Sequence, residues 1–178
     1  MNKPSENYYQ QESERLVFRE INAEDAENWA PFFIDNPAQK YVGADQFSFP
    51  PKEKATNWLS KQIERKENQT YGQLAVIDKQ TNTFIGVGGI IERDMSGQKA
   101  YEITYSFLPS AWGKGFATEL AIHFKQYAFN NIQTDSVISM IHKENEASIN
   151  VAVKNGMSLS GETEFMGMEL FVYRVYRN

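Results

Sequence analysis

The chain has 178 residues, which fits one domain on a prior of roughly 100–200 residues per domain. Hydrophobic residues make up 41% and charged residues 23%, an ordinary globular composition that excludes a disordered or fibrous chain. The formal charge of -5 argues against the basic surface that nucleic-acid binding needs, and the absence of cysteine excludes disulfides, thiolate metal sites and cysteine nucleophiles.

The first 13 residues are polar and predict a loose tail or a short edge extension, so the predicted folded domain spans residues 14–178. This segment lacks the apolar stretch that a signal peptide needs. No apolar run in the sequence approaches the ~18 residues of a membrane span. We therefore expect a cytoplasmic protein that does not enter a membrane.

Alternating apolar side chains predict a first strand over residues 14–20. A helix is predicted next, because Asn22 and Asp25 have the spacing of a capping box, and Pro37 is expected to end it. The apolar stripe of this helix would consist of Ala26, Trp29, Ala30 and Phe33. Residues 41–51 are rich in Pro, Phe and Gly and predict a long loop over an opening.

Regular patterns of helix and strand fill the rest of the chain. Pro51 can start a second helix, and three strands joined by short turns then predict an antiparallel meander over residues 71–78, 83–93 and 99–109. The remaining elements are a helix over 116–130, a strand over 134–141, a helix over 144–157 and strands around 157–164 and 168–176.

This order of elements has no internal repeat and predicts a single α/β domain. We expect a mixed, mostly antiparallel sheet of about seven strands, flanked by about four helices. The last two strands could offer a free edge to a second copy of the chain, so a homodimer stays open.

The segment most typical of a binding site is the connection between the strand at 99–109 and the helix that follows. It contains Gly113 and Gly115, which allow a close approach to the backbone, and Lys114 adds a positive charge. The unpaired N–H groups and positive dipole end of the helix, together with the Thr118 hydroxyl, favour an anion such as a phosphate. The alternative is that the two glycines only shape a tight connection.

The residues of this connection can be compared with two known phosphate-binding loops. A Walker A loop fails, because Lys114 is followed by Gly115 and the upstream glycine is missing. A dinucleotide fingerprint has its third glycine replaced by Thr118, although Asp135 lies about 20 residues further on, where an acid that binds the ribose would stand. An NAD(P)-binding enzyme therefore remains an alternative.

Residues 14–176 resemble the GCN5-related N-acetyltransferases (GNAT), and among them the RimJ/RimL-like branch that acetylates protein N-termini and related amines. The resemblance rests on ERLVFRE as the opening strand, EITYSFLP as the central strand, AWGKGFATE as the pyrophosphate loop and ENEASINVAVKNGM as the later helix. Trp112, Gly115 and Ala117 stand at the three fixed places of the family's loop, Q/R-x-x-G-x-G/A. Trp112 departs from Gln or Arg, but this branch often has an aromatic residue there. Splayed central strands are implied as well.

The resemblance implies that acetyl-CoA is the cosubstrate and that backbone amides of the loop hold its pyrophosphate. It implies that the pantetheine arm lies along Phe107 and Leu108, and that Asn145 bonds to the pantetheine amides. Asn145 could at the same time cap the helix that begins near Glu146. The expected cofactor-binding residues of the loop are Trp112, Gly113, Lys114, Gly115, Phe116, Ala117 and Thr118.

The sequence has no cysteine and no GxSxG or HExxH motif, which leaves direct transfer to an amine. The amine must lose its proton before it attacks, so a base or a chain of waters is required. Glu102 is the candidate, because a carboxylate in a central strand is expensive to bury without a purpose or a partner. The alternative is a structural ion pair with Lys or Arg, whereas the resemblance implies a base that acts through water.

The resemblance also implies that Ser148 lies near the thioester sulfur, where its hydroxyl would assist the departing thiolate. Many family members have a tyrosine four residues later, and Ala152 stands there instead. A non-catalytic acyl-CoA-binding module is therefore a further alternative. His123 and His142 are not spaced as metal ligands, and we assign no metal.

The acceptor site is expected between the first two helices, the 41–51 loop that begins at Tyr41, and the final hairpin. Its aromatic walls would be drawn from Trp29, Phe32, Phe33, Phe47, Phe49 and Trp58, of which Trp29, Phe33 and Trp58 are more typical of core. The acceptor amine stays open among a protein N-terminus, such as that of a ribosomal protein, a polyamine, an amino acid and an aminoglycoside.

Overall fold

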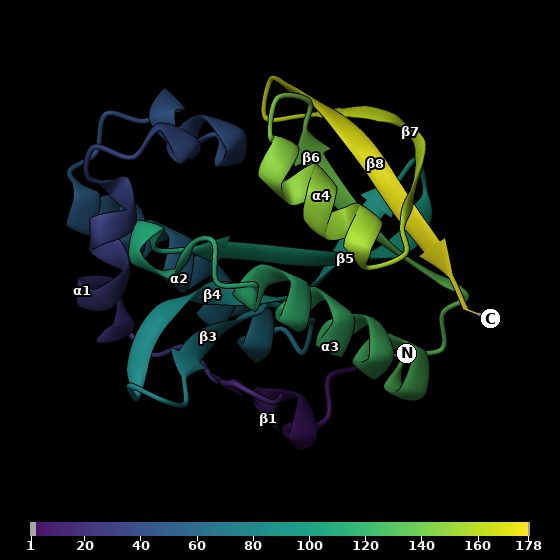
Figure 1. Cartoon of the computed structure of the whole chain (residues 1–178), viewed down its shortest axis with the longest axis horizontal. Coiled ribbons are helices and arrows are strands. Elements are labelled where there is room, and N and C mark those ends of the chain that lie inside the picture. Colours follow the sequence, from purple (N-terminus) through teal and green to yellow (C-terminus); the bar gives the residue numbers. More distant parts are fainter. Residues whose placement is uncertain (1–2, 178) are drawn as a thin grey trace.

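In the computed structural model, which describes residues 3–177, the chain forms an eight-stranded sheet with helices on both faces (Figure 1). The helices are α1 (Asp25–Trp29), α2 (Pro51–Glu67), α3 (Phe116–Asn131) and α4 (Glu146–Lys154). The strands are β1 (Gln10–Glu12), β2 (Leu16–Arg19), β3 (Gln73–Asp78), β4 (Thr83–Met95), β5 (Gln98–Phe107), β6 (Ser136–His142), β7 (Ser158–Phe165) and β8 (Met168–Tyr176). Within residues 3–177, none of the helices has the length and apolar character needed to cross a membrane.

The strand order is β1-β2-β3-β4-β5-β6-β8-β7. The strands β3, β4 and β5 pair antiparallel as the predicted meander requires, and β2 pairs antiparallel with β3. The exception to antiparallel pairing is β5 with β6, which run parallel and share a single register pair, Glu102↔Ile138. Beyond that pair β6 turns away from β5, and β6, β8 and β7 diverge from the rest of the sheet (Figure 1). This divergence is the splay that the resemblance implies.

The N-terminal segment supplies the eighth strand. Of the two expectations for residues 1–13, the described part from residue 3 onward is an edge extension: β1 pairs with β2, after a 3-10 helix η1 (Glu6–Tyr9). Tyr8 is fully buried, and its hydroxyl donates to Gly72 O at 2.6 Å and accepts from Ile90 N at 2.8 Å. A loose tail is therefore the wrong description for these residues, since Tyr8 is part of the core.

The first helix is shorter than the sequence predicts. Its capping box is present, with Asn22 and Asp25 exchanging backbone-to-side-chain hydrogen bonds of 3.0 and 3.1 Å. After Trp29 the chain tightens into a 3-10 helix η2 (Ala30–Phe33), because Pro31 has no N–H and cannot continue an α-helix. Pro37 does not end this element but begins η3 (Pro37–Val42), followed by η4 (Ala44–Gln46), so part of the expected loop is helical.

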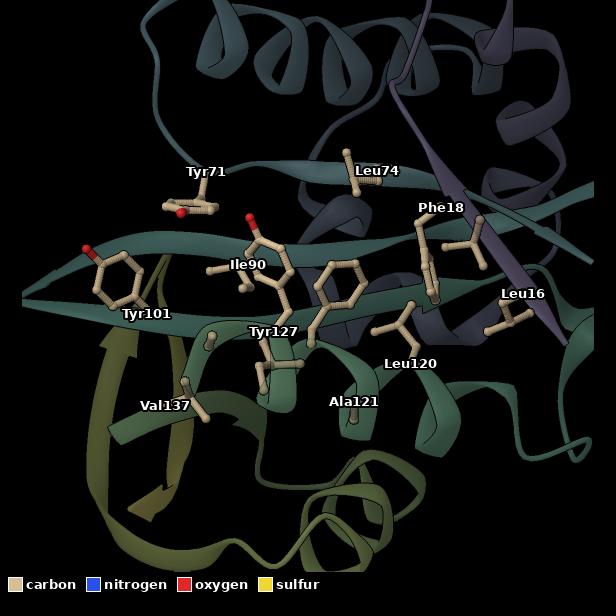
Figure 2. Packing of buried hydrophobic residues seen from close by; sticks show 14 of the residues in the cluster. Leu16, Phe18, Tyr71, Leu74, Ile90, Tyr101, Leu120, Ala121, Tyr127 and Val137 are labelled. Atoms are coloured by element: carbon tan, nitrogen blue, oxygen red, sulfur yellow. The ribbon is translucent and has the colours of Figure 1, made fainter. Parts of the chain in front are cut away.

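Two apolar clusters lie on opposite faces of the sheet. The larger one packs β2 to β5 against α3, and Figure 2 shows Phe18, Ile90, Leu120 and Tyr127 meeting there. The smaller one joins Trp29 and its neighbours on α1, η2 and α2 to Ala75 and Val87 of the sheet. The larger cluster holds one face of β5 through Tyr101, Ile103 and Phe107, and the side chains of Glu102, Thr104 and Ser106 alternate with them.

Candidate active site

The anion-binding loop that the sequence predicts lies between β5 and α3. A short 3-10 helix η5 (Pro109–Ala111) leads into it, and Gly113 and Gly115 adopt φ values of 74° and 80°, a region that favours glycine. Gly115 is the N-cap of α3 and has no side chain to satisfy the first N–H groups of the helix. Those donors and the dipole end are thus available to an anion.

Arg15 holds this loop from the opposite side, which the sequence analysis missed. Its Nη1 donates to the carbonyl oxygen of Lys114 at 2.8 Å, and its Nε pairs with Glu119 Oε2 at 2.7 Å. Burial alone would raise the pKa of Glu119, but hydrogen bonds from Ser13 and Arg15 outweigh burial and lower it. Because about 100 residues separate Arg15 from the loop, no local sequence pattern could have revealed the contact.

The other predicted loop residues take different places. Trp112 is half exposed, and its Nε1 donates to the carbonyl oxygen of Phe107 at 2.8 Å, which ties the loop to the end of β5. Phe107 itself is buried in the larger cluster, and the N–H of Leu108 is used by Ile85 O at 2.9 Å. Lys114 is exposed, whereas Phe116 is buried.

A cavity of about 610 Å³ opens where β5 and β6 diverge. It lies between η3, η4 and α2 on one side and β6, the start of α4 and the β7–β8 hairpin on the other. Three predicted site residues line it together: Glu102, Asn145 and Ser148. The loop residues from Trp112 to Thr118 and the strand end at Phe107 and Leu108 do not line this cavity.

Glu102 is the one carboxylate of the cavity wall among the described residues. Its side chain is almost fully buried, with Oε2 2.6 Å from Nε of Arg93 and Oε1 accepting from the N–H of Met140 at 3.3 Å. The ion pair that the sequence left as an alternative therefore exists. A carboxylate offers about four acceptor positions, so these two bonds leave capacity for a further donor such as water.

Asn145 is the N-cap of α4, because its Oδ1 accepts from the N–H of Ser148 at 3.2 Å. That bond leaves the Nδ2 donors of Asn145 for a ligand in the cavity. Ser148 is half-buried in the first turn of α4, and the hydroxyl of Tyr105 donates to its carbonyl oxygen at 3.4 Å. Burial raises the pKa of Tyr105 well above its usual value, so this phenol stays protonated in the cavity wall.

The aromatic residues divide between wall and core. Phe33, Phe47, Phe49 and Trp58 line the cavity, as does Tyr41. Trp29 and Phe32 are buried in the smaller cluster and line none of it. The expectation of a core position is thus confirmed for Trp29, while Phe33 and Trp58 serve both the cluster and the wall.

The two histidines lie apart from each other. The ring of His123 stacks on Phe18 and its Nε2 lies 2.9 Å from Gln11 Oε1, whereas His142 lies in the cavity wall beside Tyr41. Burial lowers the pKa of His123. Across residues 3–177, no three His, Asp or Glu side chains are grouped so that they could hold a metal ion.

Comparison with known families explains why the loop, the splayed strands and the cavity occur together. The family model described as "Acetyltransferase (GNAT) domain" matches residues 15–158. The chain belongs to the GNAT acetyltransferases. It is thus an acyltransferase by family. The divergence of β5 and β6 is the splay of the central strands that the sequence resemblance implies.

Relatives and solved structures agree with this family. The chain is 36% identical to the uncharacterized protein YkkB of Bacillus subtilis over 96 residues, 54% of this chain and 56% of that protein. It is 27% identical to the uncharacterized N-acetyltransferase p20 of Bacillus licheniformis over 84% of this chain and 82% of that protein. The alignment with YkkB thus spans little more than half of that relative.

Two solved structures illustrate the likeness of fold. An acetyltransferase from Agrobacterium tumefaciens superposes with a TM-score of 0.77 at 22% identity, covering 94% of each chain. RimL, a ribosomal L7/L12 alpha-N-protein acetyltransferase in complex with coenzyme A, superposes with a TM-score of 0.75 at 16% identity, covering 92% of this chain and 95% of that one. At these identities the likeness concerns the fold.

Proposed function

We propose that this GNAT protein transfers the acetyl group of acetyl-CoA directly to a primary amine, in a ternary complex. The observation that carries the proposal is the cavity between β5 and β6, which brings Glu102, Asn145 and Ser148 together. The proposed acceptors are protein N-termini, including those of ribosomal proteins, and small-molecule amines. The first of these is supported by RimL, a protein of the same fold that is described as a ribosomal L7/L12 alpha-N-protein acetyltransferase.

The residues present fit acetyl-CoA. Around Gly113 nothing lies within 4 Å of where a Cβ would stand, and the free N–H groups of the loop through Thr118 match the charge of a pyrophosphate. The Nδ2 group of Asn145 can donate to an amide carbonyl of the pantetheine arm. Beyond its one pair with β6, the edge of β5 toward Phe107 and Leu108 is not paired with that strand, and we place this arm along it.

Before it attacks, the ammonium form of the acceptor must lose one proton. Glu102 takes this proton through a bound water, and Arg93 orients the carboxylate for this role. A C–N bond then forms as the C–S bond of the thioester breaks, and the Ser148 hydroxyl donates a hydrogen bond to the departing thiolate. Acetyl-CoA, when bound, would supply the activated acetyl group, and the thiolate takes up the second proton, which the nitrogen loses as the amide forms.

Thermal unfolding in the presence of ligands tests the cofactor. Acetyl-CoA at 100 times its Kd should stabilise the chain by about 2.7 kcal/mol, and at about 2–4 °C per kcal/mol this raises the midpoint by about 5–11 °C. CoA should act in the same way, while ATP and NADH should not. A shift with NADH alone would overturn the proposal in favour of a dinucleotide enzyme.

A pair of glycine variants locates the binding site. Gly115→Val places a side chain at φ 80° and 3.4 Å from Arg15 Nη2, so it should remove most of the acetyl-CoA shift. Gly97→Val, at φ 83° in the β4–β5 turn with nothing within 4 Å, carries the same backbone strain and should retain the shift. A shift without CoA release on any amine would indicate a non-catalytic acyl-CoA binder.

A further inference from the structure

The charge of the cavity is opposite to that of the whole chain. The chain carries -5, yet the described cavity wall contains Lys54, Lys61, Arg65 and Arg93 against the single carboxylate of Glu102. A surface of this sign attracts an anionic ligand and repels a polyamine or an aminoglycoside. The overall charge of the protein therefore misleads about the ligand.

Three of the four cations form a stripe along α2. Residues 54, 61 and 65 are spaced by seven and four, which places them on one face of a helix, and the stripe extends about 16 Å. Lys54 lies in the first turn of α2, where its Nζ donates to Gln39 at 3.1 Å, and Lys61 lies between Lys54 and Arg65. Arg65 lies at the far end of the stripe, close to Arg93.

Arg65 is the cation that most needs a partner. It is half-buried, and none of the ion pairs between described residues includes it. Burial, and after it the positive charge of Arg93, lowers the pKa of Arg65, while Glu102 and Glu92 act in the opposite direction. A guanidinium in such a place is well suited to a carboxylate or a phosphate, which it can bind with two parallel hydrogen bonds.

Arg93 offers further donors to the same anion. Its Nε is used by Glu102, and its guanidinium lies 4.8 Å from the ring centre of Phe165. An arginine has five N–H donors, so the bond to Glu102 leaves most of them for a ligand. Because Arg93 touches Glu102, an anion bound by Arg93 lies close to the proposed base.

The cations are too far from the loop to serve the pyrophosphate of CoA. Arg93 is opposite Ala100 on β5, and seven residues at about 3.3 Å each separate Ala100 from Phe107, a distance of about 23 Å. Arg65 and Arg93 therefore meet the acceptor and not the phosphates at the other end of the strand.

We propose that the acceptor is a compact amine that carries a carboxylate or phosphate group, such as a free amino acid, and that Arg65 and Arg93 bind this anion beside Glu102. The inference rests on the proposed transferase function and specifies its substrate class. The cavity volume of about 610 Å³ is within the range of small-molecule sites, about 300–1,000 Å³. A protein N-terminus has an amide at this position and would leave Arg65 without its anion.

Initial rates on matched acceptors test the substrate class. Because the chain has no cysteine, a thiol reagent reports only the CoA that is released. Each free amino acid is compared with its own carboxamide, and O-phosphoethanolamine with ethanolamine. We expect the best anionic acceptor to exceed its neutral partner by about 10-fold or more in kcat/KM, and the two pairs distinguish carboxylate from phosphate.

Variants on neighbouring residues of α2 test the site itself. Arg65→Gln should raise KM for the anionic acceptor by about 10- to 100-fold, change kcat little and leave the neutral partner unaffected. Lys66→Gln is the matched control, since Lys66 pairs with Glu20 and does not line the cavity. An equal loss for both members of a pair, or a preference for neutral amines, polyamines or acidic peptides, would overturn the inference.

Binding without turnover separates this inference from the proposed function. The midpoint of thermal unfolding is measured with the free amino acids and their carboxamides, for wild type, Arg65→Gln and Lys66→Gln. A shift caused by the anionic form and lost only in Arg65→Gln supports the anion site even if no amine is acetylated, in which case the transferase function alone fails. Acetylation of amines without such a shift or preference would overturn the anion site and leave the transferase function standing.

Discussion

Glu102→Gln is the variant that distinguishes a base from a structural ion pair. Glutamine keeps the size of the side chain and an acceptor for the N–H of Met140, which lies 3.3 Å from Oε1. It loses the negative charge that faces Nε of Arg93 at 2.6 Å. A hydrogen bond between charged groups contributes about 1.5–3 kcal/mol, so the midpoint of unfolding should fall by about 3–12 °C. The variant should therefore remain folded at room temperature.

The effect on turnover should be much larger than this loss of stability suggests. General base catalysis contributes roughly 10²–10⁴ in rate, which is about 2.7–5.5 kcal/mol of activation free energy. We expect kcat/KM of Glu102→Gln to fall by this factor at a temperature where the chain is folded, while the acetyl-CoA-induced shift of the midpoint persists. The assay is CoA release, normalised to the folded fraction by circular dichroism.

Two controls exclude a merely structural explanation. Glu92→Gln removes another glutamate of the same sheet that pairs with a cation, Lys99, but does not line the cavity, and its turnover should stay near that of wild type. An acceptor amine whose pKa lies well below the assay pH is already neutral and needs no base, so its loss in Glu102→Gln should be far smaller. An equal loss for both kinds of amine, or turnover within about threefold of wild type, would refute Glu102 as the base.

Two further predictions concern stability. Tyr8→Phe removes a hydroxyl that bonds to the buried N–H of Ile90 and to the carbonyl of Gly72. Each group left unsatisfied costs about 1–3 kcal/mol, so the midpoint of thermal unfolding should fall by several degrees. An unchanged midpoint would mean that the N-terminal segment does not pack as described. The pKa of Glu119 is lower in the folded chain than its usual value, so its contribution is present above the unfolded pKa of about 4.3 and is lost as pH falls through the folded pKa. Denaturation at a series of pH values should therefore show a loss below about pH 4.5 that is smaller in Glu119→Gln, and identical pH profiles would contradict it.

Much of the fold could be predicted because its signals are local. The apolar spacing of α3, the two glycines before it and the turn residues between β3, β4 and β5 each depend on a few neighbouring residues. The predicted length of the first helix was wrong, because Pro31 changes its last turn to 3-10 geometry although the apolar spacing continues. The burial of Tyr8 could not be predicted, because the residues around it in the sequence are polar and do not indicate that its ring reaches the core.

The candidate site divides along the same line. The loop from Gly113 to Thr118 and the N-cap at Asn145 could be predicted, because a strand, a turn and a helix start define them. The partners of Glu102 could not, because they depend on the register of β4 on β5 and on where β6 leaves β5. The spacing of Lys54, Lys61 and Arg65 indicates that they share one face of α2, but the sequence does not show that this face lines a cavity.

The sequence by itself indicated the family, the order of the elements from β2 onward and the glycine loop before α3 that we propose binds an anion, since periodicity, glycine conformation and helix ends act over short distances. Only the tertiary structure decided that Arg93 neutralises Glu102, that Arg15 holds the loop and that Arg65 lacks an acidic partner among the described residues. They depend on how separate segments pack, over nine residues for Arg93 and Glu102 and over 99 for Arg15 and Lys114. Packing brings such charges together, and the same packing excludes the water that would otherwise screen them.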